Sequence, residues 1–340
     1  MSKKILHFGI IGAGRIGRVH AETLAFRLPE AEIVSVTDAN REAAEQLAAR
    51  CGIPTIAATS DELLADPRID AVLICSPTPT HADLIVAAAK AGKHIFCEKP
   101  IAFSLAKIDA ALEAVKAAGV QLQIGFNRRF DANFGRVRQA IATGEIGKPQ
   151  LMHIISRDPA PPPAQYVAQS GGMFLDMTIH DFDMARFLMG EEVEEIYTSG
   201  GCMIDPAIGE AGDLDTALIV LRFTSGAIGT IDNSRKAVYG YDQRVEVLGS
   251  EGKIETNNCY PNQASVSGAK NVYRDLPLNF FMERYTESFA TELKSFTQAV
   301  LENKPTVVTG IDGRSPVVMA KAARKSYDEH RPVKLSEITE

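Results

Sequence analysis

Three residues capable of proton transfer recur at helical spacing between Gly171 and Leu188. Asp176 and His180 are four positions apart, and Asp183 follows one turn later. On one continuous helix these side chains share a face. An imidazole near its ordinary pKa of about 6.5 accepts a proton at neutral pH, and a neighbouring carboxylate orients it. The pattern favours a general base, with a structural histidine or a metal triad as the alternatives. Because no further cluster with metal-ligand spacing occurs, we expect no metal.

A second reactive group, Lys99, lies in the sequence C-E-K-P at 97–100, directly after the short apolar run His94–Cys97. A residue that precedes proline is held in extended geometry, which directs the Lys99 ammonium along a fixed line. Ligands bind at the carboxyl ends of strands in open α/β sheets. We therefore expect Lys99 to take part in chemistry, rather than to be a solvated lysine that happens to precede proline.

The elements that must position these groups begin with a glycine-rich turn. The apolar run Ile5–Ile11 predicts a buried strand, and Gly12, Gly14 and Gly17 follow it at G-x-G-x-x-G spacing. The first glycine allows a tight turn, the second lets the backbone approach a pyrophosphate, and the third lets a helix pack close to the sheet. An ordinary glycine turn is the alternative. The strand before the motif, the helix after it and the acid about 20 residues later, Asp38, favour dinucleotide binding.

Asp38 ends a second branched apolar run, Ile33–Val36, and its carboxylate indicates which dinucleotide binds. A carboxylate accepts both ribose hydroxyls of NAD but repels a 2′-phosphate, so we predict NAD, although Arg41 could soften the repulsion. The loops after the apolar runs at 71–75 and 94–97 should add further contacts. The expected cofactor-binding residues are Gly12, Ala13, Gly14, Arg15, Ile16, Gly17, Asp38, Ser76, Thr78, His81, Glu98 and Lys99.

Charge and cysteine content limit the partners and the compartment. The net charge of −7, without a basic block, argues against binding to nucleic acid or to anionic membranes. The five cysteines are scattered and odd in number, which fits a reducing, cytoplasmic compartment. We expect no signal peptide, because His7 interrupts the first apolar stretch, and no apolar run approaches the roughly 18 residues of a membrane span.

The pattern of elements predicts an α/β protein with two domains. Strands and helices alternate up to residue 125, as in a doubly wound parallel sheet of Rossmann type. From 126 to 340 we expect an α+β domain with an open, mostly antiparallel sheet, because repeated strand-like runs are separated by turns between 193 and 268. The prolines of 158–163 exclude regular structure there, and 172–190 reads as one helix. The last two helices could pack back on the first domain.

Five motifs carry a resemblance to a known family. They are G-A-G-R-I-G-R-V-H at 12–20, C-E-K-P at 97–100, G-F-N-R-R-F at 125–130, D-M-T-I-H-D-F-D at 176–183 and Y-G-Y-D at 239–242. Over nearly its whole length the chain resembles the glucose–fructose oxidoreductase/inositol dehydrogenase/MocA (Gfo/Idh/MocA) family. The greatest similarity is to its myo-inositol 2-dehydrogenases, in particular to the type with S-R-D-P before a proline-rich loop.

The resemblance implies an NAD-dependent oxidation of a secondary hydroxyl of a cyclic polyol, with myo-inositol giving 2-keto-myo-inositol (scyllo-inosose). It implies that His180 accepts the proton, that Asp176 orients His180, and that Lys99 binds and polarises the substrate hydroxyl. The positions that match the family's sugar pocket are Arg128, Asp158, Asp183 and Tyr239. An open sheet that serves oligomerisation, commonly in a homotetramer, is a further implication.

The chain departs from some inositol dehydrogenases at one place. Ser156 and Asp158 stand where those proteins carry His and Asn. This leaves the exact substrate open, although Asp158 can still accept hydrogen bonds from two vicinal hydroxyls. A scyllo-inositol or pyranose dehydrogenase is the alternative within the family. A non-catalytic, nucleotide-sensing regulator is the alternative outside catalysis, and the joint presence of Lys99, Asp176 and His180 argues against it.

Overall fold

A computed structural model describes residues 4–340, and the chain forms two compact units. The first contains residues 4–130 and 287–317, together with Glu340. The second contains residues 131–286 and 318–339. The division thus falls near residue 130, not 125, and a segment from the end of the chain returns to the first unit. No helix within 4–340 is both long and apolar enough to cross a bilayer.

The first unit is built on a six-stranded parallel sheet with the order β3-β2-β1-β4-β5-β6. Its strands are β1 (Leu6–Ile11), β2 (Ala31–Thr37), β3 (Thr55–Ile56), β4 (Ala71–Ile74), β5 (His94–Cys97) and β6 (Leu122–Ile124). Every residue of β4 is buried, as expected for a central strand covered on both faces. The predicted doubly wound parallel sheet is confirmed.

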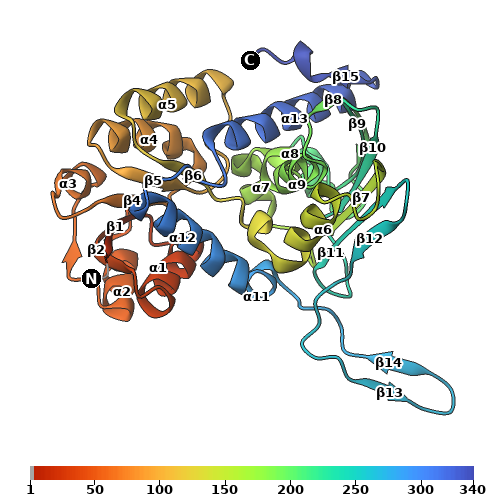
Figure 1. The fold of residues 1–340 in the computed structure, drawn as a ribbon, viewed down its shortest axis with the longest axis horizontal. Coiled ribbons are helices and arrows are strands. Elements are labelled where there is room, and N and C mark those ends of the chain that lie inside the picture. The colour runs from red at the N-terminus through yellow and green to blue at the C-terminus, as the bar shows by residue number, and fades with distance from the viewer. Residues whose placement is uncertain (1–3) are drawn as a thin grey trace. The chain divides into compact units, whose positions relative to one another are not determined.

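Helices cover both faces of this sheet (Figure 1). They are α1 (Arg15–Arg27), α2 (Arg41–Cys51), α3 (Ser60–Ala65), α4 (His81–Lys90), α5 (Leu105–Ala118) and, from late in the chain, α12 (Thr286–Leu301). The short 3-10 helices η1 (Thr78–Thr80) and η2 (Asn127–Phe130) lie in loops. On one face the core joins Phe8 of β1 to Phe296 of α12, with ring centroids 6.1 Å apart. That contact explains why α12 belongs to this unit.

The first turns of several helices are fixed by side-chain caps. Asn40 Oδ1 accepts the N–H of Glu42 at the start of α2, and Thr59 Oγ1 accepts the N–H of Glu62 at the start of α3. Thr59, and not the neighbouring Ser60, is therefore the N-cap of α3. Thr80 does not cap α4, because its hydroxyl bonds to Ser76 Oγ and to the Pro77 carbonyl.

The second unit contains a seven-stranded mixed sheet with the order β12-β11-β7-β10-β9-β8-β15. The strands are β7 (Pro149–Arg157), β8 (Val193–Gly201), β9 (Thr216–Phe223), β10 (Ile228–Ser234), β11 (Asp242–Gly249), β12 (Lys253–Thr256) and β15 (Val333–Lys334). Only the β7–β10 pair is parallel, so the predicted mostly antiparallel sheet is confirmed.

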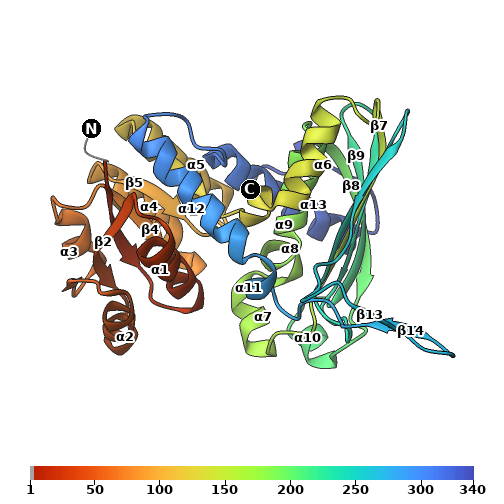
Figure 2. The ribbon, with the colours of Figure 1, turned by 60° about the horizontal axis from the view of Figure 1, so that its bottom comes forward.

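Helices cover one face of this sheet, with α6, α8 and α9 lying beside it in Figure 2. Besides α12, the helices after residue 130 are α6 (Ala132–Ala142), α7 (Ala164–Ser170), α8 (Gly172–Asp176), α9 (Ile179–Met189), α10 (Pro206–Glu210), α11 (Phe281–Arg284), α13 (Gly310–Glu329) and the 3-10 turn η3 (Leu335–Glu337). The opposite sheet face exposes large apolar side chains. They are Tyr197, Leu218, Ile228 and Leu248, each at least 40% exposed.

Two features of the second unit were not predicted. The stretch 172–190 is not one helix, because α8 ends at Asp176 and α9 begins at Ile179. A hairpin of β13 (Ser265–Ser267) and β14 (Val272–Arg274) also forms, and every residue from 261 to 276 is exposed. Its strands, Ser-Val-Ser and Val-Tyr-Arg, have three residues each and are too short to show an alternating pattern.

Candidate functional site

The glycine-rich turn between β1 and α1 has the geometry of a phosphate cradle. Gly12 has φ +105°, and a Cβ there would lie 2.6 Å from the Cys75 carbonyl carbon. A Cβ at Gly17 would lie 2.0 Å from Gly12 O, so the helix approaches the turn more closely than any side chain permits. A Cβ at Gly14 would meet no atom within 4 Å. The turn is therefore packed on its inner side and open at the N-terminus of α1, where an anion binds.

Asp38 follows β2 directly and is attached to this turn. Its Oδ2 accepts the N–H of Ala13 at 2.6 Å, and its Oδ1 accepts the N–H of Asn40 at 2.7 Å. A carboxylate has about four lone-pair sites, so acceptor capacity remains for ribose hydroxyls. The cradle and the acid therefore fit a dinucleotide with an unphosphorylated ribose.

The loop after β4 carries three predicted cofactor-binding residues, of which two are partly exposed and one is buried. Ser76 and Thr78 are partly exposed, and Ser76 Oγ lies 2.6 Å from Thr80 Oγ1. His81, in contrast, is 1% exposed, with Nε2 2.7 Å from Ser76 O and Nδ1 2.8 Å from Pro100 O. Burial lowers the pKa of His81, and the two carbonyls only partly offset this effect. The ring of His81 is thus buried between the loops that carry Ser76 and Pro100, and its contact with the cofactor stays a prediction.

The loop after β5 carries Glu98 and Lys99, both partly exposed, and Lys99 precedes a cis proline. Glu98 Oε1 lies 2.6 Å from Nε2 of His20, a residue of α1 that is fully buried. The Glu98 carboxyl also packs on Gly125, where a Cβ would lie 3.0 Å from Oε2. Sequence reasoning did not assign His20 a role, although it ends the motif at 12–20.

In the second unit, Asp176 lies at the end of α8 and is held by two residues that the sequence did not indicate. Tyr166 donates its hydroxyl to Asp176 Oδ1 at 3.0 Å. The guanidinium of Arg235 lies 3.4 Å from Asp176 Oδ2 through both Nη1 and Nη2. Arg235 is 1% exposed, so its charge is compensated inside the protein by the carboxylate.

His180 lies in the first turn of α9 and is partly buried. The acid that follows it, Asp181, is fully buried and accepts the amide of Asn233 at 2.9 Å. Asn233 in turn accepts the hydroxyl of Thr178 at 2.6 Å. This network ties the start of α9 to β10 and thereby fixes the backbone that carries His180. Asp183, predicted to line a sugar pocket, is 1% exposed.

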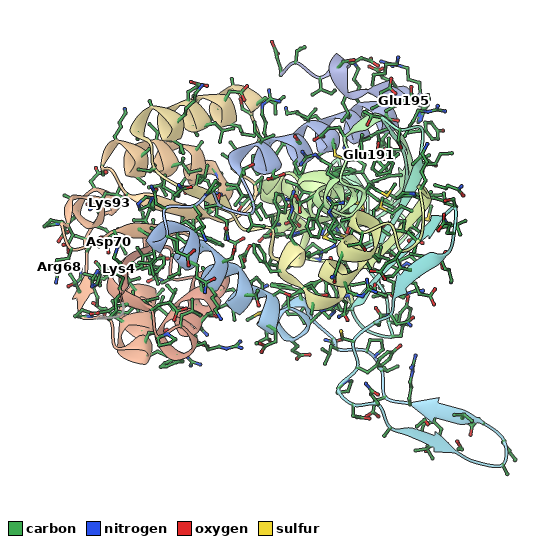
Figure 3. The ribbon with its side chains drawn as sticks, viewed as in Figure 1. Lys4, Arg68, Asp70, Lys93, Glu191 and Glu195 are labelled. Atoms are coloured by element: carbon green, nitrogen blue, oxygen red, sulfur yellow. The ribbon has the colours of Figure 1, made fainter. Side chains whose placement is uncertain are left out.

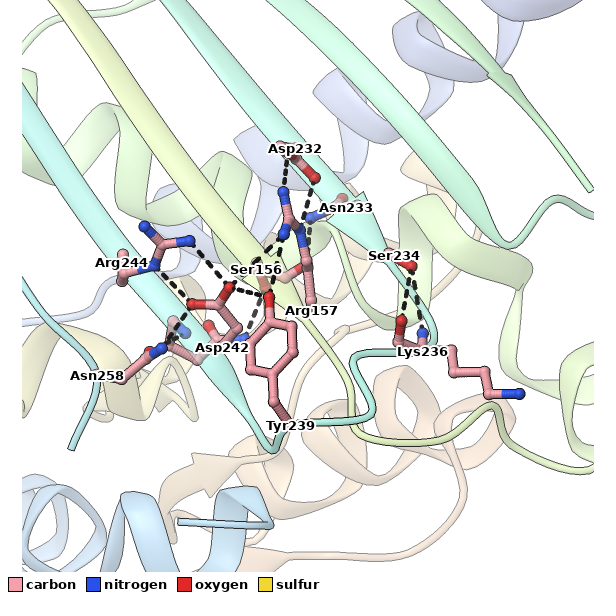
Figure 4. Close-up of polar contacts among 11 residues, drawn as sticks. Ser156, Arg157, Asp232, Asn233, Ser234, Lys236, Tyr239, Asp242, Arg244 and Asn258 are labelled. Carbon is pink, nitrogen blue, oxygen red and sulfur yellow. Dashed lines mark hydrogen bonds and ion pairs between the residues drawn. The ribbon is translucent and has the colours of Figure 1, made fainter. Parts of the chain in front are cut away.

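Tyr239, predicted to bind substrate, precedes β11 and belongs to a polar network (Figure 4). Tyr239 donates to Asp242 Oδ2 at 2.6 Å and accepts from Arg157 Nη1 at 3.1 Å. Burial would raise the pKa of Asp242, but hydrogen bonds from Arg244, Tyr239 and Asn258 outweigh it and hold that pKa below its usual range. The Tyr239 hydroxyl is thus already engaged on both sides.

The remaining predicted substrate residues differ in exposure. Asp158 is partly exposed, and its backbone accepts the N–H of Ala237 at 2.6 Å. Arg128, in the first unit, is 5% exposed. Ser156 is fully buried and accepts the amide of Gln243 at 3.0 Å.

A depression of about 450 Å³ lies at the other edge of the first unit's sheet. It is lined in part by Lys4, Asp70 and His94, at the amino ends of β1, β4 and β5. Figure 3 labels Lys4 and Asp70, which lie near each other. The glycine turn lies at the carboxyl ends of the strands, so this depression is not the dinucleotide site. Among residues 4–340 no group of three His, Cys, Asp or Glu side chains could hold a metal ion.

Comparison with known proteins assigns both halves of the chain. Residues 6–126 match the profile described as the oxidoreductase family with an NAD-binding Rossmann fold, and residues 134–255 match the GFO/IDH/MocA C-terminal domain. The chain belongs to the Gfo/Idh/MocA oxidoreductase family. Its first domain is therefore an NAD-binding Rossmann domain, and the predicted cofactor, NAD, is confirmed.

Relatives within the family match over nearly their full length. A myo-inositol 2-dehydrogenase of Thermotoga maritima is 48% identical over 98% of this chain and 99% of its own. An inositol 2-dehydrogenase of Rhizobium meliloti is 45% identical over 97% and 99%. A scyllo-inositol dehydrogenase of Lactobacillus casei, solved with bound NAD(H) and scyllo-inositol, is 28% identical with a TM-score of 0.92, over 98% and 100%. The myo-inositol dehydrogenase of that organism, solved with NAD(H) and myo-inositol, has 27% identity and a TM-score of 0.87 over 97% and 96%.

Proposed function

We propose that this protein is an NAD-dependent inositol 2-dehydrogenase that oxidises a secondary hydroxyl of myo-inositol to 2-keto-myo-inositol. The observation that carries the proposal is the 45–48% identity, over nearly the whole chain, to inositol 2-dehydrogenases. The glycine cradle with Asp38 attached to it supports the choice of cofactor. When bound, NAD supplies the hydride acceptor, the nicotinamide C4.

The chain's own residues supply the proton chemistry. In the proposal, His180 accepts the hydroxyl proton as hydride leaves the same carbon, so the alcohol loses two electrons and two hydrogens in total. Asp176 orients the imidazole and compensates its charge. Lys99 donates a hydrogen bond to the substrate oxygen and favours its deprotonated form. Substrate hydroxyls are bound by the remaining polar residues, for which we propose Arg128, Asp158, Asp183 and Tyr239.

The experiment is a substrate panel, in which NAD reduction is followed by absorbance with myo-inositol, scyllo-inositol and several pyranoses. The highest kcat/KM should be with myo-inositol. A higher value with scyllo-inositol or a pyranose would contradict the substrate but keep the chemistry. If no polyol or sugar reduces NAD while a protein partner binds in an NAD-dependent way, the regulator alternative is correct.

The catalytic roles are tested by Lys99→Met and His180→Ala. Each substitution should lower kcat by about 10²–10⁴-fold, because it removes a group that acts on the substrate hydroxyl while its proton is transferred. The affinity for NAD, measured by calorimetry, should stay within about threefold of wild type. Wild-type rates from both variants would reject these roles.

We further propose that the protein forms homo-oligomers, in the family's manner as tetramers, through the exposed sheet face of the second unit. Tyr197, Leu218 and Ile228 lie there on the neighbouring strands β8, β9 and β10, and Leu248 lies on β11, beyond β7. Such an exposed apolar face marks an interaction site. In sedimentation, Leu218→Lys with Ile228→Lys should give smaller particles than wild type.

Five free cysteines support a reducing, cytoplasmic location, which would be checked by cell fractionation.

A further inference from the structure

Two buried histidines of the first unit hold the residues on either side of Lys99. His20 comes from α1 and is fully buried, with its Nε2 2.6 Å from the Glu98 carboxylate. His81 comes from the start of α4 and is 1% exposed, with its Nδ1 2.8 Å from the Pro100 carbonyl. Glu98 and Pro100 are the immediate neighbours of Lys99 in the chain. The side chain before the lysine and the backbone carbonyl after it are therefore each held to the body of the unit by an imidazole.

The packing around His20 leaves its ring little freedom. Its edge meets Phe96 with centroids 5.1 Å apart and Phe289 with centroids 5.7 Å apart. Within the described part of the chain, Nδ1 of His20 has no hydrogen-bond partner. The neutral tautomer with hydrogen on Nε2 satisfies this arrangement, because it donates to Glu98 and leaves only a lone pair unbonded. The ring of His20 thus donates one hydrogen bond, from Nε2 to the Glu98 carboxylate.

Both histidines also belong to the parts of the unit that hold the dinucleotide. His20 lies one helical turn beyond Gly17 on α1, whose N-terminus forms the phosphate cradle. His81 Nε2 lies 2.7 Å from the carbonyl of Ser76, in the loop after β4. His20 therefore joins the Lys99 loop to α1. A neutral His81 has one ring N–H and donates to only one of its two carbonyls, and in the tautomer with hydrogen on Nδ1 it donates to Pro100 O while its ring packs on the loop that carries Ser76.

We propose that His20 and His81 are positioning residues that hold Lys99 in its working geometry, by fixing Glu98 and Pro100 to the two loops that bind the dinucleotide. The inference rests on the proposed role of Lys99. A misplacement of a catalytic group by about 1 Å can cost about 10²-fold in rate. Loss of either imidazole should therefore reduce the rate of chemistry far more than it reduces cofactor affinity.

The test is a pair of double-mutant cycles on the full-length protein with NAD and myo-inositol. His20→Ala and His81→Ala are each combined with Lys99→Met, and kcat and the NAD dissociation constant are measured. Each single histidine variant should lower kcat by about 10- to 100-fold. In the Lys99→Met background the same substitution should lower kcat by less than about twofold, because no lysine is left to misplace. His7→Ala, an exposed histidine of β1, is the matched control and should act as wild type in both backgrounds.

Equal fractional losses in both backgrounds would overturn the inference, since they would assign the histidines a general structural role. A wild-type kcat for both single histidine variants would also overturn it. If Lys99→Met itself keeps the wild-type rate, the role of Lys99 fails instead, so the two failures are distinguishable. Should an alanine variant fail to fold, His20→Gln and His81→Gln enter the same cycles. Each retains one amide donor, and intermediate losses that vanish without Lys99 support the inference.

Discussion

The carboxylate of Asp38 and the backbone N–H of Ala13 are joined by a hydrogen bond of 2.6 Å. The residue that we predict to select the ribose thereby also holds Ala13 of the glycine-rich turn. If the prediction is correct, recognition of the ribose and the shape of the turn depend on the same side chain.

Asp38→Ala should therefore weaken NAD binding for two reasons, the lost ribose contact and the released turn. A hydrogen bond to a charged group contributes about 1.5–3 kcal/mol, which corresponds to roughly 10- to 100-fold in affinity. Binding of NADP should weaken less, so the preference for NAD over NADP should fall. Calorimetric titration of both nucleotides measures the ratio. An unchanged ratio would show that Asp38 does not determine cofactor choice.

Gly14 and Gly17 provide a matched pair of substitutions with different outcomes. A Cβ at Gly17 would lie 2.0 Å from Gly12 O, which is backbone and cannot give way, whereas a Cβ at Gly14 would meet no protein atom within 4 Å. Gly17→Ala should lower both the melting temperature and NAD affinity. Gly14→Ala should leave the melting temperature within a few degrees of wild type but lower NAD affinity, because its methyl group enters the space of the pyrophosphate. Thermal melts with and without NAD distinguish the two, and equal melting temperatures for both variants would refute the packing argument.

We expect Arg235 to affect catalysis, although no pattern in the sequence indicated it. Its guanidinium is almost fully buried and lies 3.4 Å from Asp176 Oδ2, so it helps to hold that carboxylate in place. Arg235→Met removes this contact and should lower kcat by about 10-fold or more, because a misplaced catalytic group costs rate. Arg235→Lys keeps a positive charge and should retain more of the wild-type kcat than Arg235→Met. Equal kcat for wild type and Arg235→Met, with a lower melting temperature for the variant, would show that Arg235 serves stability only.

The first unit was predictable because its signals are local in the sequence. Gly12, Asp38 and Lys99 each lie at the end of a short apolar run, and strand ends meet at one edge of a parallel sheet. The direction of the His81 ring was not predictable, because a loop residue and the first residue of a buried helix share the same sequence context. Likewise, no repeat connects Arg235 with Asp176, 59 positions away, since their contact depends on how β10 meets α8.

The break between α8 and α9 was not predicted from the sequence, for a different reason. Met177 has φ −96° and ψ −62°, and Thr178 has φ −65° and ψ −21°, so both residues keep right-handed helical dihedral angles. The apolar spacing therefore continues through the break, and the periodicity of apolar residues alone cannot predict where one helix ends and the next begins. The position of Ser156 depends on strand register, because the next residue, Arg157, lies on the other face of the sheet.

His94 should make the stability of the protein depend on pH near neutrality. Its Nδ1 accepts the N–H of Gln121 at 3.0 Å, and burial lowers its pKa, with the charge of Asp70 opposing that shift. As pH falls through the ordinary histidine pKa of about 6.5, the unfolded chain gains a proton that the folded chain does not bind. The free energy of unfolding therefore falls as pH falls from 7 to 5.5, by at most about 1.4 kcal/mol per pH unit for this one proton. His94→Asn keeps an acceptor for the Gln121 N–H but does not titrate, so urea unfolding at several pH values should show a shallower decline for the variant. Parallel declines for the two proteins would assign the pH dependence to other groups.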